Sequence, residues 1–203
     1  MRYSEEQIME VIRCRDSIEY FADNHIKVSM PNGVIQIQLN DFQRQVIRNY
    51  QNDRAFFLPA ERQAGKTTVA AIILLHQAIF HNDRVSLIMA PKKAISSFII
   101  ELMTEMYDRL PEYIAGVRIT TRNKSTIGFE NGCTVISAGS DANYGRGRAL
   151  SNIYIDESEW VDCSEILHSL WPCTATIPYA KTFALSSTKT EELFRRLNTG
   201  PTS

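Results

Sequence analysis

The sequence of 203 residues lacks any marked excess of charge, internal repeat or low-complexity tract. Its 22 Lys and Arg residues nearly balance 23 Asp and Glu residues, so the formal net charge is −1. Binding to nucleic acid through overall charge is therefore excluded, and such a partner must meet a local patch or another part of a larger machine. The length and the 44% hydrophobic content describe a globular chain with one full core.

Metal-binding cysteine motifs and membrane signals are also missing. The four cysteines form no C-x-x-C pair and no metal-ligand spacing with the four histidines. We expect buried free thiols in a reducing cytosol. Residues 1–13 are amphipathic and contain acidic side chains, unlike a signal peptide, and no run approaches the roughly 18 apolar residues of a spanning helix. These absences predict a cytoplasmic-type protein without a membrane partner.

The most informative stretch is residues 56–68, FFLPAERQAGKTT, in which an apolar strand leads through a polar turn into an apolar helical run. Strand, Gly-Lys-Thr turn and helix form the context of a phosphate-binding loop. Backbone N–H groups at the helix start would cradle phosphate oxygens, and the helix dipole would favour them. Lys66 adds a charge for the terminal phosphates, and the Thr67 hydroxyl is offered to Mg²⁺.

Two positions of this loop depart from the usual pattern. Ala60 stands five positions before Gly65, where a glycine is usual, and Glu61 and Arg62 stand where small residues are common. The alternative is an ordinary strand–turn–helix corner. The apolar strand before the turn and the apolar helix after it favour a nucleotide loop.

A second anchor is the apolar strand within residues 151–158, which ends in Asp156 and Glu157. Ligands bind at the carboxyl ends of strands in open parallel sheets. Asp156 can hold Mg²⁺ through its water shell, and Glu157 can polarise an attacking water. The alternative is a pair of carboxylates that cap the next helix. The spacing of about 90 residues after Lys66 favours the catalytic interpretation.

Two further pairs are candidates for nucleotide contacts. Phe42 and Gln43 start a helix one element before the loop, so the ring could stack on adenine and the amide could read its edge. A solvated glutamine is the alternative. Ser187 and Thr188 follow the final strand, 182–186, which we expect beside the first. Their hydroxyls can sense a γ-phosphate, or they can cap the next helix.

Hydrophobic periodicity predicts an α/β fold with a mostly parallel sheet, flanking helices, an N-terminal helix and a β-hairpin. Helices are expected at 5–24, 41–51, 67–80, 94–109 and 191–197. Strands are expected at 55–58, 85–90, within 111–121, at 153–157 and at 182–186, with hairpins at 26–39 and 126–138. Residues 139–151, with Arg146 and Arg148, are expected to form a functional loop.

We expect one domain overall. Residues 1–52 would pack on a P-loop core at 53–198, and residues 199–203 would form a tail.

In the loop around Lys66 and in the strand that ends in Asp156 and Glu157, the chain resembles the ATPase domain of the large terminase subunit of tailed bacteriophages. Its likeness is greatest to the myovirus-type DNA-packaging motors. The resemblance extends over nearly all of the chain. It is carried by the helix end at 14–22, by 34–44, by the loop 62–68, by Gly145-Arg146-Gly147 and by the strand 153–157. An arginine in the place of Arg62 is typical of that family.

The resemblance implies an ASCE-type P-loop ATPase fold with ATP and Mg²⁺. It implies phosphate and nucleotide contacts from Arg62, Gln63, Ala64, Gly65, Lys66, Thr67 and Thr68. It further implies Thr67 and Asp156 on Mg²⁺, Glu157 as catalytic carboxylate, Phe42 and Gln43 at adenine, and Ser187 and Thr188 in coupling. Arg62 acting within the subunit and Arg146 acting on a neighbour's nucleotide both remain candidates for neutralising charge on the γ-phosphoryl group.

The implied partners are double-stranded DNA, a portal protein and the small terminase subunit. The implied assembly is a ring on the portal vertex in the host cytoplasm, and the isolated domain is expected to be a monomer. The family continues into a lid-like subdomain and an RNase-H-like nuclease, whereas this chain stops at Ser203. We therefore expect no nuclease activity, and weak nucleotide affinity without the lid. The chain would be either an excised motor domain or a truncated gene product.

Two other functions are compatible with the same motifs. A helicase-type or restriction-type DNA translocase shares the loop and the Asp-Glu pair, but a helicase needs a second motor domain that 203 residues cannot supply. A nucleotide-binding scaffold that does not hydrolyse would act through assembly. Glu157 argues against the scaffold, since that carboxylate serves hydrolysis.

Overall fold

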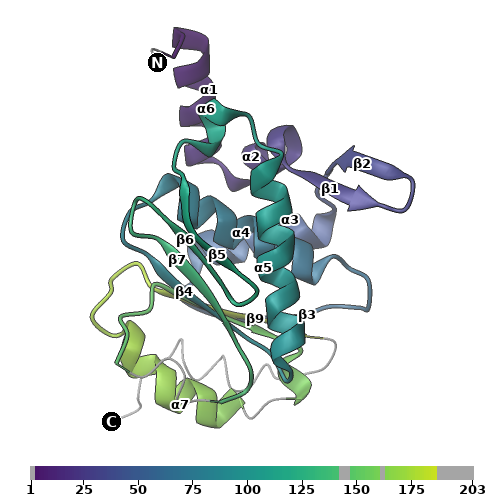
Figure 1. The fold of residues 1–203 in the computed structure, drawn as a ribbon. Helices are drawn as coiled ribbons and strands as arrows, with labels where there is room; N and C mark the ends of the chain where they lie inside the picture. Colours follow the sequence, from purple (N-terminus) through teal and green to yellow (C-terminus); the bar gives the residue numbers. More distant parts are fainter. Residues whose placement is uncertain (1–2, 142–146, 161–162, 187–203) are drawn as a thin grey trace.

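The computed structural model describes residues 3–141, 147–160 and 163–186, and shows a seven-stranded sheet with helices on both faces (Figure 1). The strand order is β3-β9-β8-β4-β7-β6-β5. The first five strands pair in parallel and the last two are antiparallel, which confirms the predicted mostly parallel sheet. The strands are β3 (Ala55–Pro59), β4 (Val85–Met89), β5 (Ile119–Asn123), β6 (Thr126–Phe129), β7 (Thr134–Ala138), β8 (Asn152–Asp156) and β9 (Lys181–Ser186).

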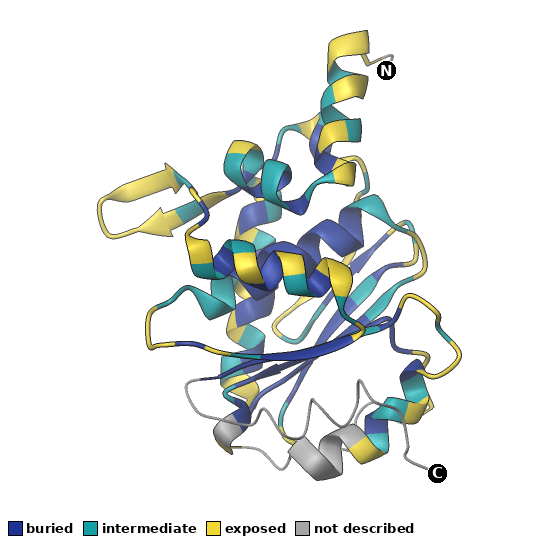
Figure 2. Ribbon diagram, turned by 180° about the vertical axis from the view of Figure 1, so that it is seen from behind, coloured by how far each residue is buried: buried dark blue, intermediate teal, exposed yellow. Residues whose placement is uncertain are grey.

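Side chains of the central strands alternate between two separate hydrophobic clusters. Tyr154 and Phe183 pack in the larger cluster with α3 (Asp41–Asn52), α4 (Lys66–Phe80) and α5 (Lys93–Asp108). Ile153 and Ile155 pack on the opposite face with Leu170 of α7 (Cys163–Thr174). Burial on both faces explains the near-continuous apolar strands. α4 is buried along most of its length and forms the centre of the larger cluster (Figure 2).

The N-terminal helix predicted at 5–24 is wrong in one respect, because it is two helices. α1 (Glu5–Asp16) and α2 (Ile18–His25) are separated by Ser17, which has an extended backbone with φ −140° and ψ 111°. The Ser17 hydroxyl accepts a hydrogen bond from the Tyr20 N–H and so begins the second helix. The apolar spacing continues across the break and therefore did not reveal it.

The other predicted elements are largely confirmed. The first hairpin is β1 (Lys27–Met30) and β2 (Gly33–Gln36), and it projects from the body of the molecule (Figure 1). Asn40 caps α3, and the helices expected at 67–80 and 94–109 are α4 and α5. In the described residues no helix combines the length and apolar character needed to cross a membrane.

Three elements were not predicted: the short helix α6 (Glu112–Ala115), the 3-10 turn Ser158–Trp160 and α7. α7 contains Pro172, which normally signals a helix end rather than a helix interior. The helix expected at 191–197 and the tail lie outside the described residues.

Candidate nucleotide site

The loop after β3 and the Asp-Glu pair after β8 lie at the same edge of the sheet. β9 lies between these two strands and pairs in parallel with both, and Leu185 is opposite Leu58 on one side and Asp156 on the other. The start of the loop and the Asp156-Glu157 pair therefore lie at the same height in the sheet, with one strand between them. Two strand spacings correspond to about 10 Å. The prediction that the final strand lies beside the first is confirmed.

The loop leaves the start of α4 open for an anion. Gly65 is the N-cap of α4 and adopts a left-handed conformation with φ 84° and ψ 26°, so it supplies no capping side chain. Gln63 also has a positive φ, 64°. The first turn of α4 holds no acidic residue, so its free N–H groups and positive dipole end face the loop uncompensated.

The basic side chains of the loop are not used for structure. Within the described residues neither the Arg62 nor the Lys66 side chain forms a hydrogen bond or a salt bridge. Arg62 is exposed, whereas Lys66, Thr67 and Thr68 are half-buried at the start of the helix. A cation held near a helix N-terminus without a partner is suited to phosphate.

Asp156 ends β8 and is almost completely buried, with 3% of its surface exposed. Burial is the main cause that raises the pKa of its carboxyl from 3.8 to about 6, and the charge of Glu157 adds to this rise. The Tyr154 hydroxyl, the Glu157 N–H and the charge of Lys66 lower the pKa. Lys66 and Asp156 therefore lie within electrostatic reach of each other.

Glu157 has an unusual backbone. Its φ is 47°, a left-handed conformation that a non-glycine residue seldom adopts. Its N–H donates to Asp156 Oδ1 at 3.0 Å, and its carbonyl accepts from the Trp160 N–H at 3.0 Å. These bonds hold the Glu157 backbone in this conformation directly after Asp156, and strain of this kind is common at functional sites.

The donors at this edge fit a magnesium ion chemically. Mg²⁺ prefers one or two carboxylates together with hydroxyl and phosphate oxygens. Asp156 supplies a buried carboxylate whose pKa is raised mainly by burial, and Thr67 supplies a hydroxyl at the start of α4.

Gln43 contacts the loop rather than open space. Its Oε1 accepts from the Asn40 N–H at 3.1 Å, and its Nε2 donates to the Gly65 carbonyl at 3.3 Å. A Cβ added to Gly65 would displace that amide, and the left-handed φ of 84° itself favours glycine at this position. Reading adenine would need this amide to turn away from the loop. Phe42 is half-buried against the larger cluster.

Three predicted site residues lie outside the described residues: Arg146, Ser187 and Thr188. Their roles stay predictions. What is described is the preceding residue, Ser186, whose carbonyl accepts from the Ala60 N–H at 2.7 Å and so links the end of β9 to the loop.

Two contributors to the site were missed from the sequence. Asn40 was expected only as a helix cap, but its Nδ2 also donates to the Ala64 carbonyl at 3.2 Å. Tyr154 was expected only as a strand residue, but its hydroxyl lies beside the Asp156 carboxyl. The signal for Tyr154 was its position two residues before Asp156, which places both side chains on one face of the strand.

An open loop before a core helix, with an Asp-Glu pair one strand removed on a mostly parallel sheet, is the arrangement of the ASCE-type P-loop NTPase fold. A family model described as "Terminase large subunit, T4likevirus-type, N-terminal" matches residues 60–170, which is more than half of the chain. The chain belongs to this family. The resemblance inferred from the two anchors is thereby confirmed.

Solved structures share the fold at low sequence identity. The large terminase of bacteriophage HK97 is 17% identical with a TM-score of 0.68, and the match covers 85% of this chain and 37% of that one. The ATPase domain of the Thermus phage P74-26 large terminase is 15% identical with a TM-score of 0.66, covering 77% and 68%. The large terminase of bacteriophage D6E in complex with ADP is 13% identical with a TM-score of 0.56, covering 73% and 39%.

The fold by itself does not separate packaging motors from helicases. The UvsW helicase of bacteriophage T4 is 12% identical with a TM-score of 0.60, and the match covers 86% of this chain and 60% of that one. The family match, rather than the fold, therefore separates the alternatives. The chain spans 37% of the length of the HK97 large terminase.

Proposed function

We propose that this chain is an ATPase motor domain that hydrolyses ATP with Mg²⁺ to move double-stranded DNA into a viral procapsid. One observation carries the proposal: the open loop and the Asp156-Glu157 pair lie at the same edge of the sheet, on either side of β9. Family membership and the fold shared with a phage terminase ATPase domain support it. The ADP complex of the D6E terminase supports a nucleotide as the ligand.

Each group at the site has a role in phosphoryl transfer, which depends mainly on positioning and charge stabilisation. The N–H groups at the start of α4 and the Lys66 ammonium would bind the β- and γ-phosphates. Thr67 and Asp156 would hold Mg²⁺, which when bound neutralises charge on those phosphates. Glu157 would accept a hydrogen bond from the attacking water and orient it.

The remaining assignments are part of the same proposal. Gln63, Ala64, Gly65 and Thr68 would line the phosphates, Phe42 and Gln43 would meet adenine, and Ser187 and Thr188 would couple hydrolysis to movement. Arg62 is exposed and without a partner among the described residues, which suits a residue that reaches the γ-phosphate within its own subunit. Arg146 acting on a neighbour's nucleotide is the alternative.

The partners and setting are proposals as well. We place the chain in the host cytoplasm, in a ring on the portal vertex with a portal protein and a small terminase subunit. Residues 1–52 would pack on the P-loop core of 53–198, followed by a tail. We expect no nuclease activity from the chain.

The test is Mg²⁺-dependent ATP hydrolysis, with and without double-stranded DNA. It should be measured on this chain and on the chain joined to the rest of a terminase polypeptide. Lys66→Ala should abolish nucleotide binding and turnover. Lys124→Ala, which removes an exposed lysine from the β5–β6 turn, is the matched control and should leave both unchanged. Wild-type hydrolysis by the Lys66→Ala variant would overturn the assignment of the loop.

A further inference from the structure

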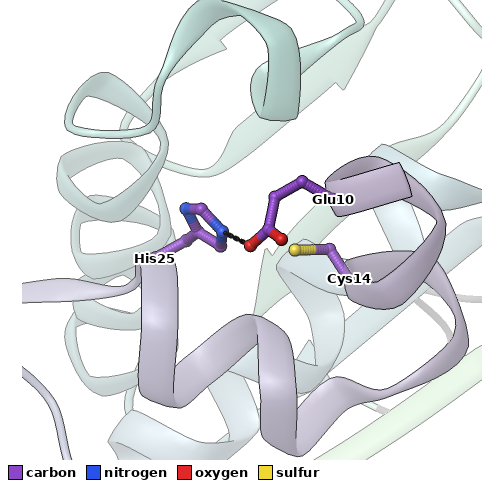
Figure 3. A group of neighbouring side chains, drawn as sticks. All are labelled: Glu10, Cys14 and His25. Carbon is purple, nitrogen blue, oxygen red and sulfur yellow. Dashed lines mark hydrogen bonds and ion pairs between the residues drawn. The ribbon is translucent and has the colours of Figure 1, made fainter. Parts of the chain in front are cut away.

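A group of three potential metal ligands lies far from the loop, where α1 meets α2. Glu10 and Cys14 are four residues apart on α1, so they share one face of that helix, and His25 is the last residue of α2. Figure 3 shows the carboxylate between the imidazole and the thiol. One donor atom from each residue lies within 4.8 Å of the other two.

We propose that Glu10, Cys14 and His25 form a binding site for a borderline-soft divalent cation, with Zn²⁺ as the expected ion. The set combines a sulfur, a nitrogen and an oxygen donor, which is the chemistry that Zn²⁺ accepts and that Mg²⁺ does not. Three protein ligands leave one tetrahedral position for water. The Glu10 side chain is 21% exposed and the His25 side chain 10%, so solvent can reach the group.

The side chains need only small shifts to bind such an ion. His25 Nε2 and Glu10 Oε1 are 2.8 Å apart in the present hydrogen bond. Two ligands at about 2.0–2.1 Å from a tetrahedral zinc would be about 3.3 Å apart, and a sulfur at about 2.3 Å would lie about 3.6 Å from each. The Glu10–His25 pair would therefore open by about half an ångström. The Cys14 sulfur, which lies within 4.8 Å of both donors, would approach by up to about 1.2 Å through side-chain rotation.

Glu10 is already oriented by an outer partner. The Tyr20 hydroxyl lies 3.1 Å from Oε1 and 3.0 Å from Oε2 of Glu10. Metal-bound carboxylates are usually held by such hydrogen bonds, which fix the ligand before the ion arrives. Arg13 lies 3.6 Å from the same carboxylate, but its side chain is largely exposed and can move away.

Two buried thiols show why Cys14 differs from an ordinary core cysteine. Cys133 Sγ lies 3.2 Å from the His81 carbonyl and 3.4 Å from the Arg84 N–H, so backbone groups satisfy it. Among the described residues Cys14 Sγ forms no hydrogen bond, although the residue is completely buried. A hydrogen bond between Glu10 and His25 accounts for those two side chains, whereas the Cys14 sulfur otherwise only packs in the larger hydrophobic cluster.

A bound ion would link α1 to α2 across the break at Ser17. Cys14 and His25 lie on either side of that residue, so the ion would join α1 to α2. The Cys14 carbonyl accepts a hydrogen bond from His76 Nε2 of α4 at 2.9 Å, so the same point of α1 is anchored on the core. The expected role of the ion is therefore structural and independent of nucleotide.

The test is titration of the metal-free 203-residue chain with Co²⁺, followed by displacement with Zn²⁺. A thiolate bound to Co²⁺ gives a near-ultraviolet charge-transfer band, whereas a cobalt ion held by oxygen ligands alone, as at Asp156, gives none. The band should appear with one equivalent, disappear on addition of Zn²⁺, and accompany a rise in Tm with Zn²⁺. Cys14→Ala should lose the band and the rise in Tm, and Cys133→Ala should keep both.

His25→Gln provides a second variant in case Cys14→Ala folds poorly. Its amide can still donate to Glu10, but the nitrogen ligand is lost, so Zn²⁺ affinity should fall by at least about 10-fold. The proposal is overturned if the wild-type chain gives no charge-transfer band at submillimolar Co²⁺. It is equally overturned if the band persists in Cys14→Ala, or if His25→Gln binds as tightly as the wild type.

Discussion

The two ends of the parallel sheet both carry basic side chains, but only one end uses them to hold the protein together. At the amino end, Lys181 Nζ donates to the carbonyls of Asp53 at 2.8 Å and Gln51 at 3.2 Å. These carbonyls lie at the end of α3, where helix carbonyls attract positive charge. At the carboxyl end, Lys66 and Arg62 have no such partner among the described residues.

The amino end also contains a cavity of about 290 Å³, lined by residues that include Tyr50, Arg84 and Tyr179. The Arg84 guanidinium bonds to the Gln77 amide and lies 4.4 Å from the centre of the Tyr179 ring. Burial lowers the pKa of His76 and of His81 to about 4, so both imidazoles are neutral at pH 7. Two basic residues of this cavity already have partners within the fold: Lys181 binds carbonyls at the end of α3, and Arg84 contacts Gln77 and Tyr179.

The difference shows which observation identifies a functional site. Basic residues occur at both ends, and the cavity of about 290 Å³ lies at the amino end, so neither feature identifies the functional site. In the part of the chain that the structure describes, only the carboxyl end combines cations without partners, a helix start without a cap and a buried carboxylate with a raised pKa. Groups whose electrostatics are unsatisfied in the folded protein are candidates for ligand binding, whereas satisfied groups stabilise the fold.

Glu157→Gln gives the largest expected effect and tests the carboxyl end directly. Loss of the carboxylate that orients water should lower ATP turnover about 10²-fold or more, while nucleotide binding persists. The free energy of unfolding should change little, because Gln keeps the backbone bonds of Glu157. Turnover and equilibrium binding of ATP are measured separately. Loss of binding together with turnover would show that Glu157 holds the nucleotide instead.

Asp156→Asn should stabilise the metal-free protein. The folded-state pKa of Asp156 is raised to about 6 from 3.8, so the folded protein retains a proton that the unfolded chain has lost. Its contribution to stability is therefore lost as pH rises from about 4 to about 6, by up to about 3 kcal/mol. The variant should remove this loss and be the more stable protein at pH 7. Urea unfolding of the wild type and the variant at about pH 4 and at pH 7, without Mg²⁺, measures the difference in free energy of unfolding between the two proteins.

The contrary outcome for Asp156→Asn is also informative. A variant that is less stable than the wild type at pH 7, with the same dependence on pH, would mean that Asp156 is a satisfied structural carboxylate. The contrast between the two ends of the sheet would then fail at its most buried residue.

Tyr50→Phe tests the amino end. The Tyr50 hydroxyl donates to Asn152 Oδ1 at 2.6 Å, and Asn152 Nδ2 donates to Ser86 Oγ at 2.9 Å, all in the core. Removal of the hydroxyl leaves a buried acceptor without its partner and should lower the free energy of unfolding by about 1–3 kcal/mol. Phe keeps the ring contact with Phe183, so packing is preserved.

The control for that variant is Tyr3→Phe, which changes an exposed tyrosine and should leave the midpoint of urea unfolding unchanged. ATP turnover per folded molecule should be the same in both variants. A turnover defect in Tyr50→Phe would show that the two ends of the sheet are coupled.

The core and the site were predictable from the sequence where the signal is local. The apolar runs of β4 and α4 predicted their own burial, and the order of residues around Lys66 predicted the strand, loop and helix that the structure shows there. The Asp-Glu pair was predictable because it ends an apolar strand. Each of these signals lies within about one turn or one strand of chain, where periodicity and turn chemistry decide the structure.

The unpredicted features depend on contacts between distant residues. The apolar spacing of α1 continues into α2, so only the Ser17 backbone reveals the break. The Gln43 amide is held by Gly65, which is remote in sequence. Cys14 and His25 have no recognisable ligand spacing, because the break at Ser17 is what turns them toward each other. Tertiary packing decides these cases.

Arg62→Ala gives the smallest expected effect on stability and is the most direct comparison of the two ends. Because Arg62 is exposed and has no structural partner among the described residues, its removal should change the free energy of unfolding by no more than about 0.5 kcal/mol. Arg84→Ala, its counterpart at the amino end, should cost about 1–2 kcal/mol, because the Gln77 hydrogen bond and the Tyr179 stacking are both lost. Urea unfolding of both variants without nucleotide measures the difference. Equal costs would mean that Arg62 is already used by the fold, and Arg62 would then no longer be free to reach a γ-phosphate.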